Sequence, residues 1–509
     1  MSRSGNRHLR PDSTGKTPVL RAGPRTVRVC GDAAYLATPA GQHLAQMTVN
    51  LLAREYKVVE AVQIDVPEIP VHTQVFPGGS TKSPLRSALQ GWGRAIAGSE
   101  IEFREVGSAE PASCTIHIGH GTAANTGLVI HTVADGWRFY CSTQDSAPSE
   151  WENDPNPLGP YIAACFAAGD AFKYFVGADT RTYACATLWN DTHGEWQHLE
   201  RGRSPAGVEL PLTYLIGAGA VGAAMVFALA ATSGITGEMI ILDPQRTDET
   251  NRNRLLSMQY HQLDDDKAAL AAGLLISSGI RALPYVGRWP DYTADSERRT
   301  APHIRAIEDA YQYQWVLSCV DRNVHRQAIA AYSPRIVIGG STQDLTAQVA
   351  LYSMRGACEC LACNHPTPHL LSAEELTKEL ADKTPEKRRE WYDLHDASQQ
   401  ERAAIEEFLI APTCGSIGEQ ALTALHREGP TDWSVGFVSA GAGVILAATY
   451  LRAVLEGTDA VIAEGSERFA WFRNPKIGRS YAERKTSCNL CADPVAQARY
   501  GRLWGTLID

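Results

Sequence analysis

The 509-residue sequence has no excess of positive charge. Its 57 acidic residues outnumber its 47 Lys and Arg residues, which gives a formal net charge of −10. Proteins that bind a nucleic-acid backbone usually carry a basic surface, so this balance argues against a nucleic-acid partner. It still allows small basic pockets that bind a nucleotide.

The amino-terminal segment 1–26 lacks the apolar core of a secretory signal. It contains six Lys or Arg residues, one acidic residue and scattered Gly, Ser and Pro. This composition predicts a disordered basic tail, although an organelle transit peptide has a similar composition and is the alternative. We therefore expect a cytoplasmic protein whose twelve cysteines are reduced thiols or metal ligands rather than disulfides.

The sequence also lacks a convincing membrane segment. Its longest stretch without charge, residues 210–237, has the length of a membrane span. Several glycines interrupt this stretch, however, and they favour a strand, a tight turn and a helix. No membrane partner is expected.

The rest of the chain shows the alternating strand and helix pattern of an α/β protein. Residues 27–185 are interpreted as a first α/β domain, in which CGDAAYLATPAG follows the first strand in place of a glycine-rich loop. Residues 186–209 are interpreted as a linker, and 210–509 as a second α/β domain. A charged helical insertion is expected at 364–413, interrupted by Pro385.

Two Ala-rich segments, 159–177 and 436–457, each lie near the end of one domain. They are weak evidence for an internal repeat, and chance could also produce them. If the repeat is real, the first copy has lost its nucleotide loop. An intrachain pseudo-dimer and a homodimer are both compatible with this pattern.

The stretch YLIGAGAVGAAMVFAL predicts a nucleotide-binding loop. Gly217, Gly219 and Gly222 follow an apolar strand and precede a helix of small residues. The first glycine permits a tight turn, the second allows a phosphate to approach the backbone, and the third allows close helix packing. Asp243 lies 21 residues after Gly222, at the end of the next apolar run, where a carboxylate can bind ribose hydroxyls.

The residues after Asp243 favour a triphosphate over a dinucleotide. Arg254 and Lys267 follow in order, and the next apolar strand leads to Asp321, which is placed to hold Mg²⁺. A pyrophosphate is bound mostly by backbone amides, whereas a triphosphate under cleavage needs side-chain cations and a metal. An NAD-dependent dehydrogenase, the alternative for such a loop, would leave these residues without a role.

The stretches GAGAVG, LDPQRTDETNRNR and CVDRNVHR, together with Lys267, resemble the adenylation domain shared by ThiF, MoeB and the ubiquitin-activating enzymes. The resemblance covers roughly 210–365, resumes around 411–457 and ends near residue 491. In that family one Asp binds ribose, an Asn, an Arg and a Lys hold the phosphates of ATP, and a later Asp coordinates Mg²⁺. The resemblance implies these roles, in the same order, for Asp243, Asn251, Arg254, Lys267 and Asp321.

The sequence departs from the family pattern at two positions. Ala220 stands where a glycine is usual, and Leu255 stands where Gln commonly follows the Arg. The arginine that family members lend to the phosphates from their amino-terminal region has no evident counterpart. The fold expected from the resemblance is a Rossmann-like ThiF-type adenylation domain, preceded by a degenerate and inactive adenylation-like α/β domain.

Two CxxC pairs, Cys360 with Cys363 and Cys488 with Cys491, can together supply a tetrahedral zinc site. The pairs are much farther apart than in a compact zinc ribbon, so their spacing alone does not settle the site. The family has the same two pairs, which implies a structural Zn²⁺ here. Cys358 is interpreted as a bystander.

Cys414 is the candidate nucleophile. It lies in the stretch APTCGSIGEQ, where a turn enters a predicted helix whose terminal amides would lower the pKa of a thiol. It also lies between the first CxxC pair and the Ala-rich helix, where the family keeps its thioester cysteine. A capping or buried cysteine is the alternative.

The resemblance implies an enzyme that adenylates the C-terminal carboxylate of a ubiquitin-like β-grasp protein. The enzyme would then take this protein as a thioester on Cys414 and pass it to a conjugating enzyme. A degenerate domain fused to an active one is most similar to the compact activating enzymes of bacterial ubiquitin-like conjugation operons, which are linked to phage defence. The alternatives are a ThiF- or MoeB-type sulfur-carrier adenylyltransferase, which leads to a thiocarboxylate, and a catalytically dead scaffold.

Overall fold

The computed structural model describes residues 19–72, 83–104, 111–123, 127–295, 313–354, 358–365, 380–394, 399–410 and 435–505. The chain divides into two compact units. One is Pro366–Asp432, and the other contains everything before and after it.

The first sheet has seven strands in the order β3-β2-β1-β4-β5-β6-β7. Its strands are β1 (Thr26–Gly31), β2 (Ala61–Asp65), β3 (Glu102–Arg104), β4 (Cys114–Ile118), β5 (Leu128–Asp135), β6 (Arg138–Ser142) and β7 (Tyr183–Thr187). The first five pair in parallel, and β6 and β7 are antiparallel additions. The central strands β1 and β4 are largely buried, as expected for a parallel sheet covered on both faces.

The second sheet has eight strands in the order β10-β9-β8-β11-β12-β13-β14-β15. Its strands are β8 (Glu209–Ile216), β9 (Thr236–Leu242), β10 (Gly279–Tyr285), β11 (Trp315–Ser318), β12 (Ile336–Gln343), β13 (Thr346–Tyr352), β14 (Glu467–Trp471) and β15 (Lys476–Ser480). The first five again pair in parallel and the rest are antiparallel. The order of the first seven repeats the first sheet, with β15 added at the edge.

The helices of the larger unit are α1 (Ala33–Leu36), α2 (Pro39–Leu52), α3 (Leu85–Ala97), α4 (Leu158–Phe175), α5 (Ala220–Ala231), α6 (Lys267–Leu274), α7 (Trp289–Ala294), α9 (Asn323–Ala330), α10 (Leu361–Asn364), α15 (Gly436–Glu456), α16 (Thr458–Glu464) and α17 (Pro494–Trp504). The described residues of this unit also include two short 3₁₀ helices, η2 (Trp196–His198) and η3 (Glu249–Asn251). Local sequence explains several starts. Pro39, for example, begins α2 after the Thr38 cap.

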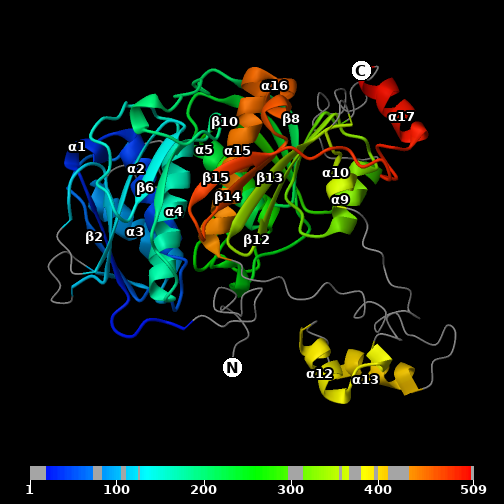
Figure 1. The fold of residues 1–509 in the computed structure, drawn as a ribbon, viewed down its shortest axis with the longest axis horizontal. Coiled ribbons are helices and arrows are strands. Elements are labelled where there is room, and N and C mark those ends of the chain that lie inside the picture. Colours follow the sequence, from blue (N-terminus) through cyan, green and yellow to red (C-terminus); the bar gives the residue numbers. More distant parts are fainter. Residues whose placement is uncertain are drawn as a thin grey trace. The chain divides into compact units, whose positions relative to one another are not determined.

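The two Ala-rich helices occupy equivalent places in the order of elements, each between the last two strands that the sheets have in common. α4 connects β6 with β7, and α15 precedes β14, which pairs with β13. α15 packs against both α4 and α5, between the sheets (Figure 1). A Cβ on Gly443 would lie 2.5 Å from the Cβ of Ala224, so small residues permit this close helix packing. One continuous apolar core includes residues from both sheets.

α15 is long and apolar enough to cross a membrane, but 89% of its apolar window is buried inside the protein. This is how the core helix of a globular protein packs. The interpretation of 210–237 as strand, turn and helix is confirmed, because β8, α5 and the start of β9 occupy this stretch.

The expected linker, 186–209, is packed against the second sheet. The carboxylate of Asp191 is 3% exposed and lies 2.5 Å from both Arg468 and Arg479, on β14 and β15. Arg468 also donates to the carbonyl of Leu188. These buried ion pairs attach the connection to the second sheet.

The expected basic tail, 1–26, lies mostly outside the described residues. Disorder is wrong for its last residues, because the amide of Arg21 donates to the carbonyl of Phe175 and its guanidinium lies 4.0 Å from the ring centre of Tyr174. Thr26 already begins β1.

The smaller unit contains α12 (Pro385–Leu394) and α13 (Gln399–Ile410). Leu380, Tyr392 and Ile405 form its own small apolar cluster. The expected interruption at Pro385 is confirmed, because residues 380–381 are helical and residues 382–384 are not. Pro385 begins α12, since proline is tolerated where the amide has no partner in the helix.

Candidate functional site

The glycine-rich loop joins the end of β8 to the start of α5. Gly217 has a φ of +96°, and a Cβ there would lie 2.8 Å from the carbonyl oxygen of Cys319. Gly219 is the N-cap of α5, which has no side-chain cap, and nothing lies within 4 Å of the position of a Cβ on Gly219. An anion can therefore approach the backbone at Gly219, next to the uncapped start of α5.

Asp243 lies at the end of β9 and touches this loop. Its two carboxylate oxygens accept hydrogen bonds from the amides of Ala218 and Gln245, each at 2.8 Å. The residue is 5% exposed, and burial raises its carboxyl pKa, opposed by these amides and by the Lys267 ammonium. Each oxygen retains a second lone pair, so the carboxylate can still accept ribose hydroxyls.

Asn251 closes the short helix η3. Its Oδ1 accepts the amide of Asp248 at 3.2 Å, and the Asp248 carboxylate accepts the amide of Thr250 at 2.7 Å. The Asn251 side chain is buried. In this structure it stabilises the turn that precedes Arg254, while its phosphate contact stays a prediction.

The Arg254 guanidinium is directed by local acceptors. Its Nη1 donates to the carbonyl of Thr250 and, at 2.8 Å, to Oδ1 of Asn253. The backbone amide of Arg254 donates to the carbonyl of Asn251 at 3.1 Å. The turn therefore limits the positions that the guanidinium can adopt.

Lys267 is the first residue of α6, and its ammonium interacts with four other charged side chains. It is 7% exposed, and its Nζ donates to Oε1 of Gln245 at 2.8 Å. Burial lowers the pKa of Lys267, while three carboxylates raise it and one guanidinium lowers it further. These charges belong to Asp243, Asp248, Asp321 and Arg254.

Three further predicted residues, Asp243, Arg254 and Asp321, thus lie near enough to Lys267 for their charges to shift its pKa. Asp321 is exposed and follows β11 by three residues, before α9. Its carboxylate lies close enough to raise the pKa of both Asp243 and Lys267. Asp248 and Gln245 were not predicted. Both stand in the polar stretch after β9, and no sequence pattern distinguishes them from their neighbours.

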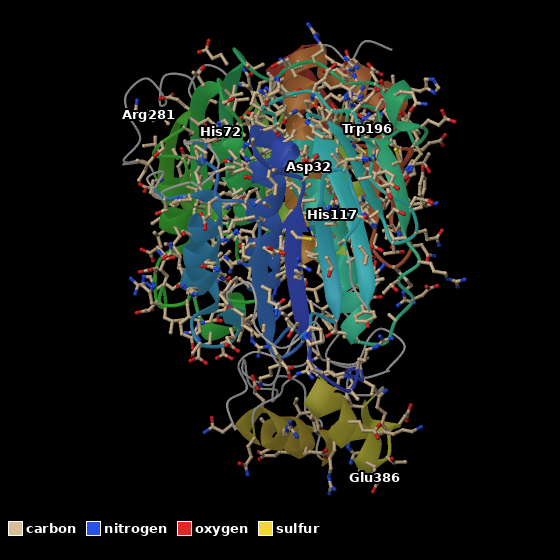
Figure 2. All side chains as sticks on the ribbon, turned by 90° about the vertical axis from the view of Figure 1, so that its left-hand side faces the viewer. Asp32, His72, His117, Trp196, Arg281 and Glu386 are labelled. Carbon is tan, nitrogen blue, oxygen red and sulfur yellow. The ribbon has the colours of Figure 1, made fainter. Side chains whose placement is uncertain are left out.

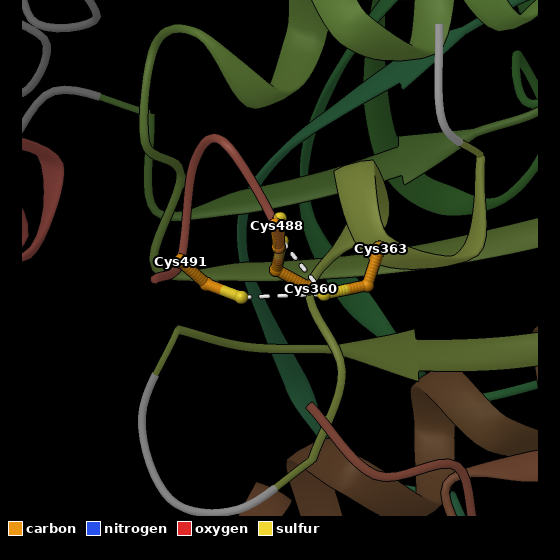
Figure 3. A group of neighbouring side chains, drawn as sticks. All are labelled: Cys360, Cys363, Cys488 and Cys491. Carbon is orange, nitrogen blue, oxygen red and sulfur yellow. Dashed lines mark hydrogen bonds between the residues drawn. The ribbon is translucent and has the colours of Figure 1, made fainter. Parts of the chain in front are cut away.

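The four cysteines of the two CxxC pairs lie together (Figure 3), and their sulfur atoms are all within 4.8 Å of one another. Cys360 Sγ lies 3.8 Å from both Cys363 Sγ and Cys488 Sγ, and Cys363 Sγ lies 3.2 Å from Cys491 Sγ. Four thiolates at about 2.3 Å from a tetrahedral zinc would be about 3.8 Å apart. The donor set and its spacing fit Zn²⁺.

The surroundings of this cluster also suit thiolate ligands. The amide of Leu490 points to Cys488 Sγ at 3.5 Å, and Lys485 donates to the carbonyl of Cys363. Cys358 stands apart, with its thiol directed to the carbonyl of Ser353. Cys414 lies outside the described residues.

Comparison with known proteins assigns both halves of the chain. Residues 213–464 match the ThiF family. These residues form a ThiF family domain. Residues 26–187 match the BilD N-terminal domain.

Individual relatives are distant. The uncharacterized protein y4jF of Sinorhizobium fredii (strain NBRC 101917 / NGR234) is 23% identical over 367 residues, which are 69% of this chain and 64% of that protein. The chain therefore matches less than two thirds of this relative. Among solved structures, E. coli MccB with succinimide is 14% identical and aligns over 55% of this chain and 65% of that chain, with a TM-score of 0.34. E. coli MccB with ATP has the same identity and coverage and a TM-score of 0.32.

The first half differs from the ThiF domain after its first strand, where Asp32 stands in place of a glycine-rich loop (Asp32 is labelled in Figure 2). After β1, the carboxylate of Asp32 caps α1 by accepting the amide of Ala34 at 2.9 Å. The hydroxyl of Thr38 caps α2 in the same way. A carboxylate therefore takes the place that an anion occupies at a free helix N-terminus, and it would repel a phosphate.

Proposed function

We propose that the ThiF domain uses ATP to adenylate the C-terminal carboxylate of a ubiquitin-like protein. The observation that carries this proposal is the set of charged side chains that act on Lys267, namely Asp243, Arg254 and Asp321, together with the uncapped start of α5 beside Asp243. The α5 amides and Asp243 suit the phosphates and ribose of a nucleotide. The two cations suit a triphosphate that gains charge during cleavage.

In the proposed reaction, a carboxylate oxygen of the substrate attacks the α-phosphorus of ATP. The bond from the α-phosphorus to the oxygen bridging to the β-phosphate breaks, and pyrophosphate leaves. No general base is needed, because a C-terminal carboxyl is ionised near pH 7. Arg254 and Lys267 stabilise the departing charge, and Mg²⁺ held by Asp321 would neutralise part of the triphosphate.

The partly desolvated Lys267 suits this role. Burial lowers its pKa in the nucleotide-free protein. A triphosphate beside the ammonium raises the pKa again, because the negative charge favours the protonated form. We therefore expect Lys267 to be charged whenever ATP is bound, at the moment when its charge is needed.

We further propose that the thiolate of Cys414 attacks the acyl-adenylate, so that a thioester forms and AMP leaves. A conjugating enzyme would then accept the carrier. The match of the first half to the BilD N-terminal domain supports an enzyme of an antiphage conjugation operon. The four-cysteine cluster would hold a structural Zn²⁺, since four thiolates leave no open coordination position.

The deciding experiment begins with affinity capture of the tagged protein from its own host and identification of a small β-grasp partner. ATP–pyrophosphate exchange is then measured with that partner. We expect exchange that depends on the partner and that is abolished by Asp321→Ala. Exchange at the full rate in Asp321→Ala would contradict the site. Formation of a thiocarboxylate on the carrier with sulfide, without an enzyme thioester, would identify a sulfur-carrier activator instead.

A further inference from the structure

A buried arginine of the first half reaches the segment of the ThiF domain that contains Arg254. Arg54 follows α2 and is 2% exposed. Its Nη1 donates to the carbonyl of Arg252 at 2.9 Å, and its Nη2 donates to the carbonyls of Met258 at 2.9 Å and Leu256 at 3.4 Å. These carbonyls stand on both sides of Arg254 in the chain.

Neighbouring residues of the first half hold the same segment. The hydroxyl of Tyr56 lies 3.4 Å from the carbonyl of Arg252. The amide of Tyr260 donates to the carbonyl of Ala95 at 3.0 Å, and the Tyr260 ring covers Gly98, where a Cβ would approach it to 2.5 Å. We call residues 54–56 and 95–98, which hold residues 252–260, the clasp.

The contact is specific because the carbonyls of Arg252, Leu256 and Met258 accept few other hydrogen bonds among the described residues. Residues 252–258 form turns rather than a helix or strand, so their buried carbonyls need donors from elsewhere. Among the described residues, no carboxylate is paired with Arg54, and the neighbouring Glu55 carboxylate has no hydrogen-bond partner. Burial lowers the pKa of Arg54 to about 10, and the group still donates at neutral pH.

We propose that Arg54 is a positioning residue of the adenylation site. In this proposal, which rests on the proposed function, the first half acts through the clasp and holds residues 252–258 so that the Arg254 guanidinium faces the triphosphate. A half without a nucleotide loop then has a defined role in catalysis. Through Arg54, the first half donates hydrogen bonds to three backbone carbonyls of the ThiF domain, those of Arg252, Leu256 and Met258.

The test compares Arg54→Ala with Arg138→Ala in the full chain. Arg138 is a matched control, because it is equally buried in the same half but pairs with Asp135, 2.7 Å away. Two quantities are measured: hydrogen–deuterium exchange of amides 250–260 without nucleotide, and kcat and KM for ATP in pyrophosphate exchange. The first readout does not depend on the reaction being adenylation.

For Arg54→Ala we expect faster exchange of amides 250–260 and a kcat lowered by about 10- to 100-fold, with a smaller change in KM, since a small displacement of a catalytic group costs this much. Arg54→Lys should recover part of kcat, because an ammonium reaches fewer of the carbonyls. Arg138→Ala should leave both readouts unchanged even if it lowers the melting temperature.

Unchanged amide exchange in Arg54→Ala would overturn the clasp, as would an equal loss of kcat in Arg138→Ala. If Arg54→Ala does not fold, Tyr56→Phe removes a single hydroxyl from the clasp. Faster exchange at 252–260 then supports the proposal, and unchanged exchange overturns it. If the wild-type protein shows no pyrophosphate exchange while Arg54→Ala still loosens the segment, the adenylation assignment has failed and the clasp has not.

Discussion

The carboxylate of Asp243 accepts a hydrogen bond from the backbone amide of Ala218 at 2.8 Å. This contact joins the expected ribose ligand at the end of β9 to the loop that follows β8. The other carboxylate oxygen holds the amide of Gln245, whose side chain in turn accepts from Lys267. One carboxylate thus organises the loop, the start of the polar stretch and the central lysine.

This arrangement makes Asp243→Asn a sensitive change. The amide nitrogen of Asn cannot accept a hydrogen bond, so one of the two backbone amides loses its partner. We expect KM for ATP to rise by about 10-fold or more, from the loss of a charge-assisted bond worth about 1.5–3 kcal/mol. Asp264→Asn, at an exposed acid of a surface ion pair, is the control. Equal KM values for the two variants would contradict the role of Asp243.

Arg254→Ala should lower kcat for pyrophosphate exchange by on the order of 100-fold, as for loss of one preorganised charge contact worth about 3 kcal/mol. Arg246 in the same polar stretch is the control, since it is exposed and forms ion pairs with Asp264 and Asp266. Arg246→Ala should change kcat little, because exposed ion pairs contribute little. A comparable loss in both variants would show that the effect comes from the loop and not from a phosphate contact.

Zinc should co-purify with the protein at one ion per chain, as measured by elemental analysis. Replacing both Cys488 and Cys491 by Ser should release the ion and lower the melting temperature, because the metal ties two distant segments together. Cys358→Ser is the matched control. Its thiol is buried two residues before Cys360 in the chain, burial raises its pKa, and it is directed to a backbone carbonyl instead. Full zinc retention in the double variant would rule out the site.

Incubation with ATP and the carrier should give an enzyme–carrier adduct that reducing agent removes. Cys414→Ala should lose the adduct and keep pyrophosphate exchange, since adenylation precedes the thiol step. Cys319→Ala is the control, because burial raises the pKa of that thiol to about 12 and leaves little thiolate. An adduct that survives in Cys414→Ala would assign the thioester to another cysteine.

Much of the ThiF domain could be predicted from short stretches of the sequence. Apolar runs that end in glycines or acids predict the strands β8 and β9, the loop between β8 and α5, and the place of Asp243. These features depend on neighbours within a few residues, where backbone sterics and hydrogen bonding act directly. The sequence supports a repeat of the Ala-rich helices only weakly. Alanine indicates close helix packing, but it does not identify the helix that packs against it.

By itself, the sequence determined the two α/β halves, the glycine-rich loop, the charged residues that follow it and the two CxxC pairs. Only the tertiary structure decided that α4 and α15 pack together between two sheets of the same strand order, and that Asp191 is buried between two arginines. It also showed that Arg54, 198 residues before Arg252, donates to that residue's carbonyl. Such contacts join residues that are far apart in the sequence and become neighbours only when the chain folds. The sequence alone offers a buried arginine many possible acceptors, and packing decides which of them lie within hydrogen-bond distance.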